Sequence, residues 1–236
     1  MKGRHLVLCL LVSVACACGA EPIDWKLTYT HHRTQDEADG QDLNLRGTRA
    51  ATVFWLGHYW RANELRQSRA GLERWFTFPW GKALLSGQAA TRGFLGVATQ
   101  AEFGAGAVRP LLGFGRTNLN PYYNLNFDPN DAITLGLSAD LPERRRASFY
   151  AVHDDRLGTG QTVLHALLRT SDNPDDRWTI DLFQRRGPLG DEGGRVVRTG
   201  LGVTYDRAPY FGRVVYDPNA NFAGHDMRRL GFGVRF

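Results

Sequence analysis

The last eleven residues constrain the fold most, because they alternate between two kinds of side chain. Leu230, Phe232, Val234 and Phe236 are apolar, and the residues between them are glycine or arginine. A period of two is typical of a β-strand with one apolar and one polar face, since successive side chains of a strand point to opposite sides. The segment therefore predicts a terminal strand whose apolar face ends on Phe236.

The first twenty residues have the pattern of a secretory signal peptide. Lys2 and Arg4 precede an apolar run over residues 6–17, and small residues follow at 18–20. A run of about twelve apolar residues is too short to span a bilayer as a helix. The sequence therefore predicts that residues 1–20 are removed during export.

Cysteine usage fits this division of the chain. Cys9, Cys16 and Cys18 all lie in the predicted signal peptide, so residues 21–236 contain none and have no disulfide or thiolate metal site. Lipoprotein processing at Cys16 or Cys18 is an alternative, but the residues before each lack the usual leucine. An uncleaved anchor would need a longer apolar run.

The charge of the chain does not point to nucleic acid. Removing Lys2 and Arg4 from the 29 basic residues leaves 27 against 24 acidic residues, a net charge of +3. The basic residues are scattered, whereas nucleic-acid-binding proteins usually gather them in one patch. We therefore expect no nucleic-acid partner.

Residues 21–236 form one predicted domain of alternating strands. Turns of roughly three to six residues alternate with loops of roughly seven to fourteen, which predicts an up-and-down order of strands. Lipid offers no hydrogen-bond partners to the backbone, so only a closed sheet can cross a membrane. We predict an all-β, up-and-down antiparallel transmembrane β-barrel of about 12 strands. The predicted strands are residues 24–32, 48–60 (where Val53, Trp55 and Tyr59 alternate), 65–76, 89–103, 108–116, 132–139, 147–153, 161–170, 178–185, 196–205, 210–216 and 227–236.

Together these features resemble a Gram-negative outer-membrane β-barrel, whose last strand usually ends in an aromatic residue. The resemblance implies an outer-membrane location, contact with outer-membrane lipid and lipopolysaccharide, and assembly machinery that reads the strand ending at Phe236. The architecture is similar to that of small monomeric porins for acidic oligosaccharides, but no motif transfers site residues. Aromatic residues near predicted strand ends suit the two membrane interfaces: Trp25, Trp60, Trp75, Trp80, Trp178, Tyr205, Tyr210 and Tyr216.

In a membrane barrel the apolar face of each strand meets lipid and the other face lines the lumen. The residues predicted to face lipid are Ile180, Leu201, Leu230, Phe232 and Val234. The basic residues predicted to line the lumen are Arg69, Arg92, Arg185, Arg198, Arg213, Arg229 and Arg235. Such a lumen predicts a passive pore for small anionic solutes or acidic oligosaccharides. Alternatively, these arginines pair with Glu73, Glu102 and Asp181 and fill a closed interior.

Two other function classes stay open. A lipid hydrolase or acyltransferase needs a serine paired with a histidine, but Ser148 and His153 lie five residues apart on one strand and therefore on opposite faces. His165 has no obvious serine neighbour, and His31, His32 and His225 fit a solvated loop better than a metal site. The other class is a structural or accessory barrel, for example in polysaccharide export. We expect no enzyme, no cofactor and no metal.

Overall fold

The computed structural model describes residues 21–62, 65–117, 132–154, 160–173, 176–188, 193–220 and 224–236. The predicted signal peptide at residues 1–20 lies outside them. The described residues form fourteen strands in one closed sheet. The strands are β1 (Asp24–Thr34), β2 (Gly40–Arg49), β3 (Thr52–Arg61), β4 (Leu65–Phe78), β5 (Gly81–Ala90), β6 (Phe94–Phe103), β7 (Val108–Thr117), β8 (Ala132–Leu141), β9 (Arg145–Asp154), β10 (Thr162–Asn173), β11 (Asp176–Pro188), β12 (Arg195–Arg207), β13 (Tyr210–Asp217) and β14 (Met227–Arg235).

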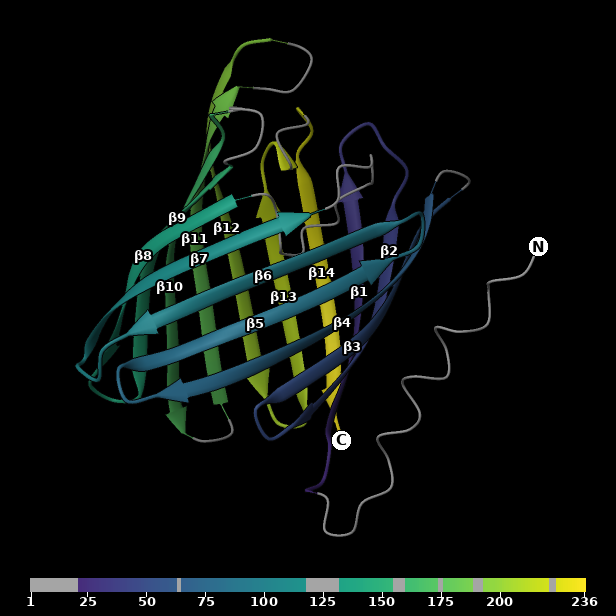
Figure 1. Cartoon of the computed structure of the whole chain (residues 1–236). Helices are drawn as coiled ribbons and strands as arrows, with labels where there is room; N and C mark the ends of the chain where they lie inside the picture. The colour runs from purple at the N-terminus through teal and green to yellow at the C-terminus, as the bar shows by residue number, and fades with distance from the viewer. Residues whose placement is uncertain are drawn as a thin grey trace.

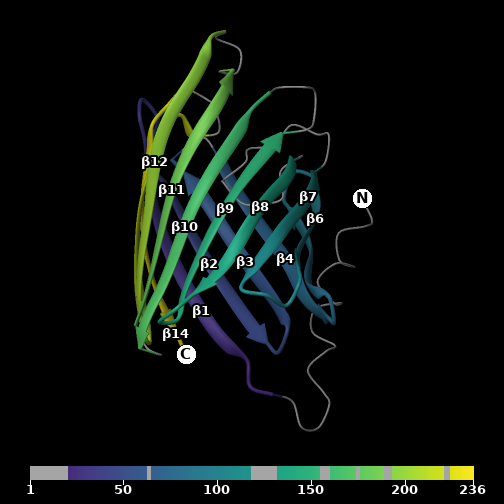
Figure 2. The ribbon, with the colours of Figure 1, turned by 90° about the vertical axis from the view of Figure 1, so that its left-hand side faces the viewer.

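Every strand pairs antiparallel with its neighbours in the chain, and β1 pairs with β14 to close the barrel (Figure 1). Trp25 and Phe236 exchange two backbone hydrogen bonds at this seam, with N···O distances of 2.9 and 3.0 Å. The all-β, up-and-down barrel is confirmed. We call the end that holds Asp24 and Phe236 the terminal end, and the opposite end the loop end. β11 and β12, the tall strands in Figure 2, project furthest at the loop end.

The prediction of about twelve strands is wrong, because β2 and β5 lie partly in segments predicted to be loops. β2 carries only Leu43 and Leu45 as large apolar residues on its outer face, so its alternation is brief. The outer face of β5 consists mostly of alanine and glycine, which give little apolar contrast. Residues 48–60 were predicted as a single strand but contain the turn at Ala50 and Ala51.

Aromatic residues gather on the outer face at the terminal end. Phe78, Trp80 and Phe103 form a stack with centroid distances of 4.8 and 5.6 Å. Trp178 lies against Tyr205 at 4.5 Å, in the position expected for an aromatic belt. Trp75 is an exception to the predicted pattern. It lies on the inner face, where the Lys82 Nζ is 4.9 Å from its ring.

The five residues predicted to face lipid all lie on the outer face of the barrel. Ile180, Leu201, Leu230 and Phe232 have between 38% and 55% of their surface exposed. That they contact lipid stays a prediction. Within the described ranges, no helix has the length and apolar character needed to cross a bilayer.

Candidate functional site

The inner face of the barrel carries aromatic rings that lie against glycines of the neighbouring strand. A Cβ on Gly200 would overlap the Phe183 ring, and a Cβ on Gly233 would overlap the Phe211 ring. The same relation joins Gly71 to Trp55 and Gly40 to Tyr59. A glycine therefore lets each ring lie flat against the wall, where a side chain would push it into the lumen.

Three of these rings support basic side chains. The guanidinium carbon of Arg185 is 5.7 Å from the Phe183 ring centroid, and that of Arg69 is 6.0 Å from Trp55. The Lys26 Nζ is 3.9 Å from the Phe211 centroid, and the Arg235 guanidinium is 5.2 Å away. Cation–π contact holds these groups close to the wall.

The inner position of Val53, Trp55 and Tyr59 departs from the simple expectation for a barrel strand. All three are at least nine-tenths buried inside the barrel, whereas Phe54 and Leu56 occupy the outer face. β3 is apolar on both faces, so its sequence marks a strand without showing which face meets lipid. This part of the interior is packed with side chains.

Of the seven predicted lumen arginines, four lie on the inner face and form ion pairs. Three of these pairs reach across an intervening strand, and Arg229–Asp217 joins the adjacent strands β14 and β13. The four pairs are Arg69–Asp42 (2.6 Å), Arg185–Asp217 (2.8 Å), Arg229–Asp217 (3.1 Å) and Arg235–Asp206 (2.5 Å). Asp217 is fully buried between its two arginines. Most of these charges are therefore compensated.

Arg198 and Arg213 lie on the inner face and are exposed to the lumen, and neither forms an ion pair with a described acid. The structure adds Arg169 of β10, which the sequence analysis missed. Arg169 is cross-strand neighbour to Arg146 and Thr179 on the inner face, is exposed, and also forms no ion pair with a described acid. β10 carries Leu164 and Leu168 on its outer face and Val163 and Leu167 on its inner face, so alternation did not mark its inner side.

Arg92 does not lie on a strand, which corrects its predicted lumen position. It occupies the turn between β5 and β6 with φ of 73° and is exposed at the loop end. Residues 89–103 were predicted as one strand, but β5 ends at Ala90 and β6 begins at Phe94.

The three acids considered as partners for the predicted arginines contact other residues. Glu73 accepts a hydrogen bond from Arg46 at 2.5 Å. Asp181 contacts the Nδ1 of His165 at 3.0 Å, and His165 stacks on Tyr150 with centroids 4.7 Å apart. The alternative pairing scheme is therefore wrong in its partners, although ion pairs do fill part of the interior.

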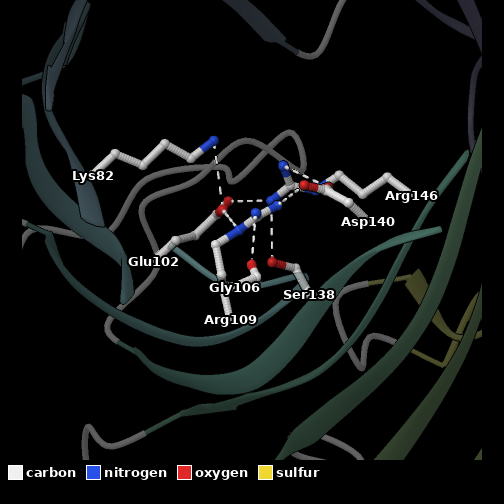
Figure 3. A network of polar contacts seen from close by, with 7 residues as sticks. All are labelled: Lys82, Glu102, Gly106, Arg109, Ser138, Asp140 and Arg146. Carbon is white, nitrogen blue, oxygen red and sulfur yellow. Dashed lines mark hydrogen bonds and ion pairs between the residues drawn. The ribbon is translucent and has the colours of Figure 1, made fainter. Parts of the chain in front are cut away.

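Glu102 is the centre of a network at the terminal end (Figure 3). One carboxylate oxygen lies 2.6 Å from Arg146, and the other lies 3.4 Å from Arg109 and 3.5 Å from Lys82. Arg109 also donates hydrogen bonds to Asp140 at 2.7 Å and to the Gly106 carbonyl at 3.2 Å. The network connects the turn after β6 to the inner face of the barrel at the terminal end. It contains three basic and two acidic side chains.

A second terminal-end network surrounds Asp206. Arg177 donates to one carboxylate oxygen at 2.7 Å, and Arg235 donates to both oxygens at 2.5 Å. Lys26 packs beside it on Phe211. Basic residues therefore exceed acidic ones in both networks at this mouth.

The interior is not completely filled by these side chains. A cavity of about 190 Å³ lies against the inner face of β4 to β9, and its lining includes Glu73, Ser86, Gln100 and Thr134. These polar groups suit water or a polar solute.

The residues considered for catalysis do not assemble into a nucleophilic site. Ser148 lies on the inner face and His153 on the outer face, where its Nδ1 is 2.8 Å from the Thr162 hydroxyl. A Ser–His contact that the sequence analysis missed joins His58 and Ser68 on the outer face at 2.9 Å. Both residues sit within paired strands. The Ser68 amide, which could serve an oxyanion hole, already donates to the Thr91 hydroxyl at 3.1 Å.

The described residues contain no group of three or more His, Cys, Asp or Glu side chains that could hold a metal ion.

Comparison with known proteins places the chain among outer-membrane barrels by fold. No protein-family model and no curated protein sequence matches the chain. The outer-membrane protein Omp33 of Acinetobacter baumannii matches with a TM-score of 0.60 and 11% identity, over 90% of this chain and 98% of that one. The chain therefore has the fold of an outer-membrane β-barrel protein.

Two porins also match, at lower structural similarity. The KdgM porin in complex with disordered oligogalacturonate matches with a TM-score of 0.46 and 8% identity, over 89% of this chain and 99% of that one. A triple mutant of the Rhodopseudomonas blastica porin matches with a TM-score of 0.48 and 9% identity, over 91% of this chain and 99% of that one.

Proposed function

We propose that this protein is an outer-membrane pore that favours small anionic solutes, including acidic oligosaccharides. The fold supports the membrane location and the porin class. The observation that carries the anion preference is the set of lumen-exposed arginines without an ion pair to a described acid, Arg169, Arg198 and Arg213. In this proposal the terminal end faces the periplasm and the loop end faces outward.

Uncompensated charges decide selectivity, because an ion pair presents little net charge to a passing solute. An arginine keeps its charge in a partly desolvated channel. Low-dielectric walls focus the field of such charges into the lumen and raise the local concentration of anions. The paired arginines at Asp206 and Asp217 contribute less to this field.

The three arginines without an ion pair to a described acid are spread along the barrel axis. Arg198 is the fourth residue of β12 from the loop end, Arg213 lies in the middle of β13, and Arg169 lies in the terminal half of β10. The networks at Glu102 and Asp206 then continue the basic character to the terminal mouth. A solute with repeated carboxylates meets a cation at each stage of this path.

We also propose that the C-terminal strand is recognised during assembly through Phe236. Phe236 has 68% of its surface exposed on the outer side of the closing seam. This position leaves the ring accessible to the assembly machinery before the barrel closes, and to lipid and lipopolysaccharide afterwards.

The test is the reversal potential of the purified protein in planar bilayers across a KCl gradient. We expect anion preference in the wild type and a shift toward zero in Arg198→Gln/Arg213→Gln, with a larger shift at low salt because screening is weaker. The matched control is Arg66→Gln/Arg186→Gln, which removes two outer-face arginines. It should keep the wild-type potential.

Two results would overturn the proposal. Conduction without anion preference would assign the unpaired arginines a structural role. Absence of conduction would reject the pore and favour a structural or accessory barrel.

A further inference from the structure

Four adjacent strands place two arginines and two threonines in one row on the inner face of the barrel. Arg169 of β10 is the cross-strand neighbour of Thr179 on β11. Thr204 of β12 lies beside Thr179 on one side and beside Arg213 of β13 on the other. We call these four residues the polar row, and Figure 2 shows β10, β11 and β12 side by side. Neighbouring strands are about 4.8 Å apart, so the two arginines are separated by roughly 14 Å along the wall.

The polar row differs from the inner-face rows beside it. The next row toward the loop end holds Leu167, Asp181, Gly202 and Val215, and the next row toward the terminal end holds Arg177, Asp206 and Phe211. Each of those rows contains a large apolar side chain and an acid, whereas the polar row contains neither. On β9 the row continues with Arg146, which already pairs with Glu102 at 2.6 Å.

The acids around the two arginines of the polar row have other partners. Asp181 and Asp217 attract Arg213 electrostatically, and Glu102 attracts Arg169 in the same way. Each of these three acids already lies within 3.0 Å of another basic side chain. Arg169 and Arg213 are exposed and form no ion pair with a described acid, so both guanidinium groups can bind acid groups of a solute.

We propose that Arg169 and Arg213 bind two separate carboxylates of one extended acidic oligosaccharide, while Thr179 and Thr204 bind hydroxyl groups between them. A guanidinium group binds a carboxylate through two parallel N–H donors. A threonine hydroxyl both donates and accepts a hydrogen bond, which suits the hydroxyls of a sugar. This inference rests on the proposed anion pore, and it names the preferred solute as a chain long enough to reach both arginines.

Binding at two points makes the affinity depend on the length of the sugar chain. Once one carboxylate is bound, a second carboxylate of the same molecule reaches the other arginine at a high effective concentration. A monosaccharide engages one arginine only. The affinity per carboxylate should therefore rise steeply at the chain length whose acid groups first span roughly 14 Å along the wall.

The experiment measures binding of uronic acid oligomers, from the monomer to the hexamer, to the detergent-solubilised, folded protein by isothermal titration calorimetry. In the wild type the hexamer should bind at least about tenfold more tightly per carboxylate than the monomer. Arg169→Gln and Arg213→Gln should each bring this ratio below about threefold, because a single arginine of the row remains. The neutral hexamer with reduced carboxyl groups should bind weakly to every variant.

The matched control is Arg198→Gln, which removes a lumen-exposed arginine outside the polar row. It should weaken binding of all oligomers by a similar factor and keep the dependence on length. Loss of the length dependence in this control, as in Arg213→Gln, would show a diffuse field of the lumen and overturn two-point binding.

The wild-type series tests the inference without any variant, because equal affinity per carboxylate at every length would overturn it. The assay needs no conduction, so its result is separate from that of the reversal potential. Anion preference without length dependence would keep the proposed pore and reject two-point binding. Length dependence in a protein that does not conduct would keep the binding site and reject the pore.

Discussion

The inner face of the barrel has two walls that use basic residues differently. On the inner faces of β2 to β9, which we call the paired wall, each described basic side chain forms an ion pair: Arg46, Arg61, Arg69, Lys82, Arg109 and Arg146. On β10 to β13, which we call the exposed-arginine wall, Arg177 and Arg185 form ion pairs with Asp206 and Asp217. The same wall also carries three arginines that face the lumen without a described acid within ion-pair distance: Arg169, Arg198 and Arg213.

The difference separates two roles of arginine in one barrel. The paired wall also holds the buried side chains of Tyr59, Gln67 and Phe94, which take up space inside the closed sheet together with the ion pairs. On the exposed-arginine wall, Arg169, Arg198 and Arg213 form no ion pair with a described acid, and we expect their charges to act on solutes that enter the lumen. Substitutions on the paired wall should therefore change stability, and those on the exposed-arginine wall should change ion preference.

The largest effect should follow from breaking the Glu102 network. Glu102→Gln removes the carboxylate that three cations share, and its side chain is only 5% exposed. Removing one partner of a buried ion pair costs about 3–5 kcal/mol. The free energy of unfolding, measured by denaturant titration in lipid vesicles, should fall by about this amount.

The matched control is Asp140→Asn in the same network. Asp140 is 51% exposed, and an exposed ion pair contributes about 0–1 kcal/mol. Equal losses in the two variants would mean that the network is solvated and that the paired wall is not packed.

A second variant tests which face meets lipid. Leu201 lies on the outer face in the middle of β12, so Leu201→Arg should destabilise the barrel by about 2–4 kcal/mol. Gly202→Ser points inward, where a Cβ would meet Val215 and Asp181 at ordinary contact distances of 3.6 and 3.8 Å. Its unfolding free energy should stay near that of the wild type. Equal effects would reverse the assignment of faces, since a shift of one residue exchanges them.

A third variant tests the contact between ring and glycine on the inner face. A methyl group at Gly200 would overlap the Phe183 ring and press on the Tyr216 carbonyl, and overpacking costs about 1–3 kcal/mol. Gly200→Ala should lower the midpoint of denaturant unfolding accordingly. Gly212→Ala meets nothing within 4 Å and serves as the control. An unchanged midpoint in Gly200→Ala would show that the ring moves away freely.

The sequence predicts the barrel well where one face of a strand is apolar and the other is not. Leu201 and Leu230 belong to such strands, and both lie on the predicted face. The prediction missed β2 and β5 because their outer faces hold few large apolar residues. β3 was predicted as a strand, but because both of its faces are apolar its sequence does not show which face meets lipid. Period-two reasoning needs contrast between the faces, and these strands offer little.

The sequence does not predict which arginine pairs with which acid, for a different reason. Arg69 and Asp42 are 27 residues apart, Arg235 and Asp206 are 29 apart, and each pair reaches across an intervening strand. Such partners depend on the register of two successive hairpins and on what the middle strand carries. Gly57 of β3, for example, leaves room beneath the Arg69 guanidinium. The alternation of residues along a strand therefore predicts which arginines point inward. It does not predict which of these arginines lack an ion pair.

The smallest loss of unfolding free energy is expected for a substitution on the exposed-arginine wall. Arg213→Gln on this wall is compared with Arg69→Gln on the paired wall. Arg69→Gln leaves the Asp42 carboxylate, 17% exposed, without its ion-pair partner. An unsatisfied polar group of this kind costs about 1–3 kcal/mol. Arg213→Gln breaks no ion pair with a described acid, so its unfolding free energy should stay within about 0.5 kcal/mol of the wild type. In bilayers the order should invert, with Arg213→Gln shifting the reversal potential more than Arg69→Gln. A stability loss at Arg213 as large as that at Arg69 would show that both arginines are structural and that the two walls do not differ.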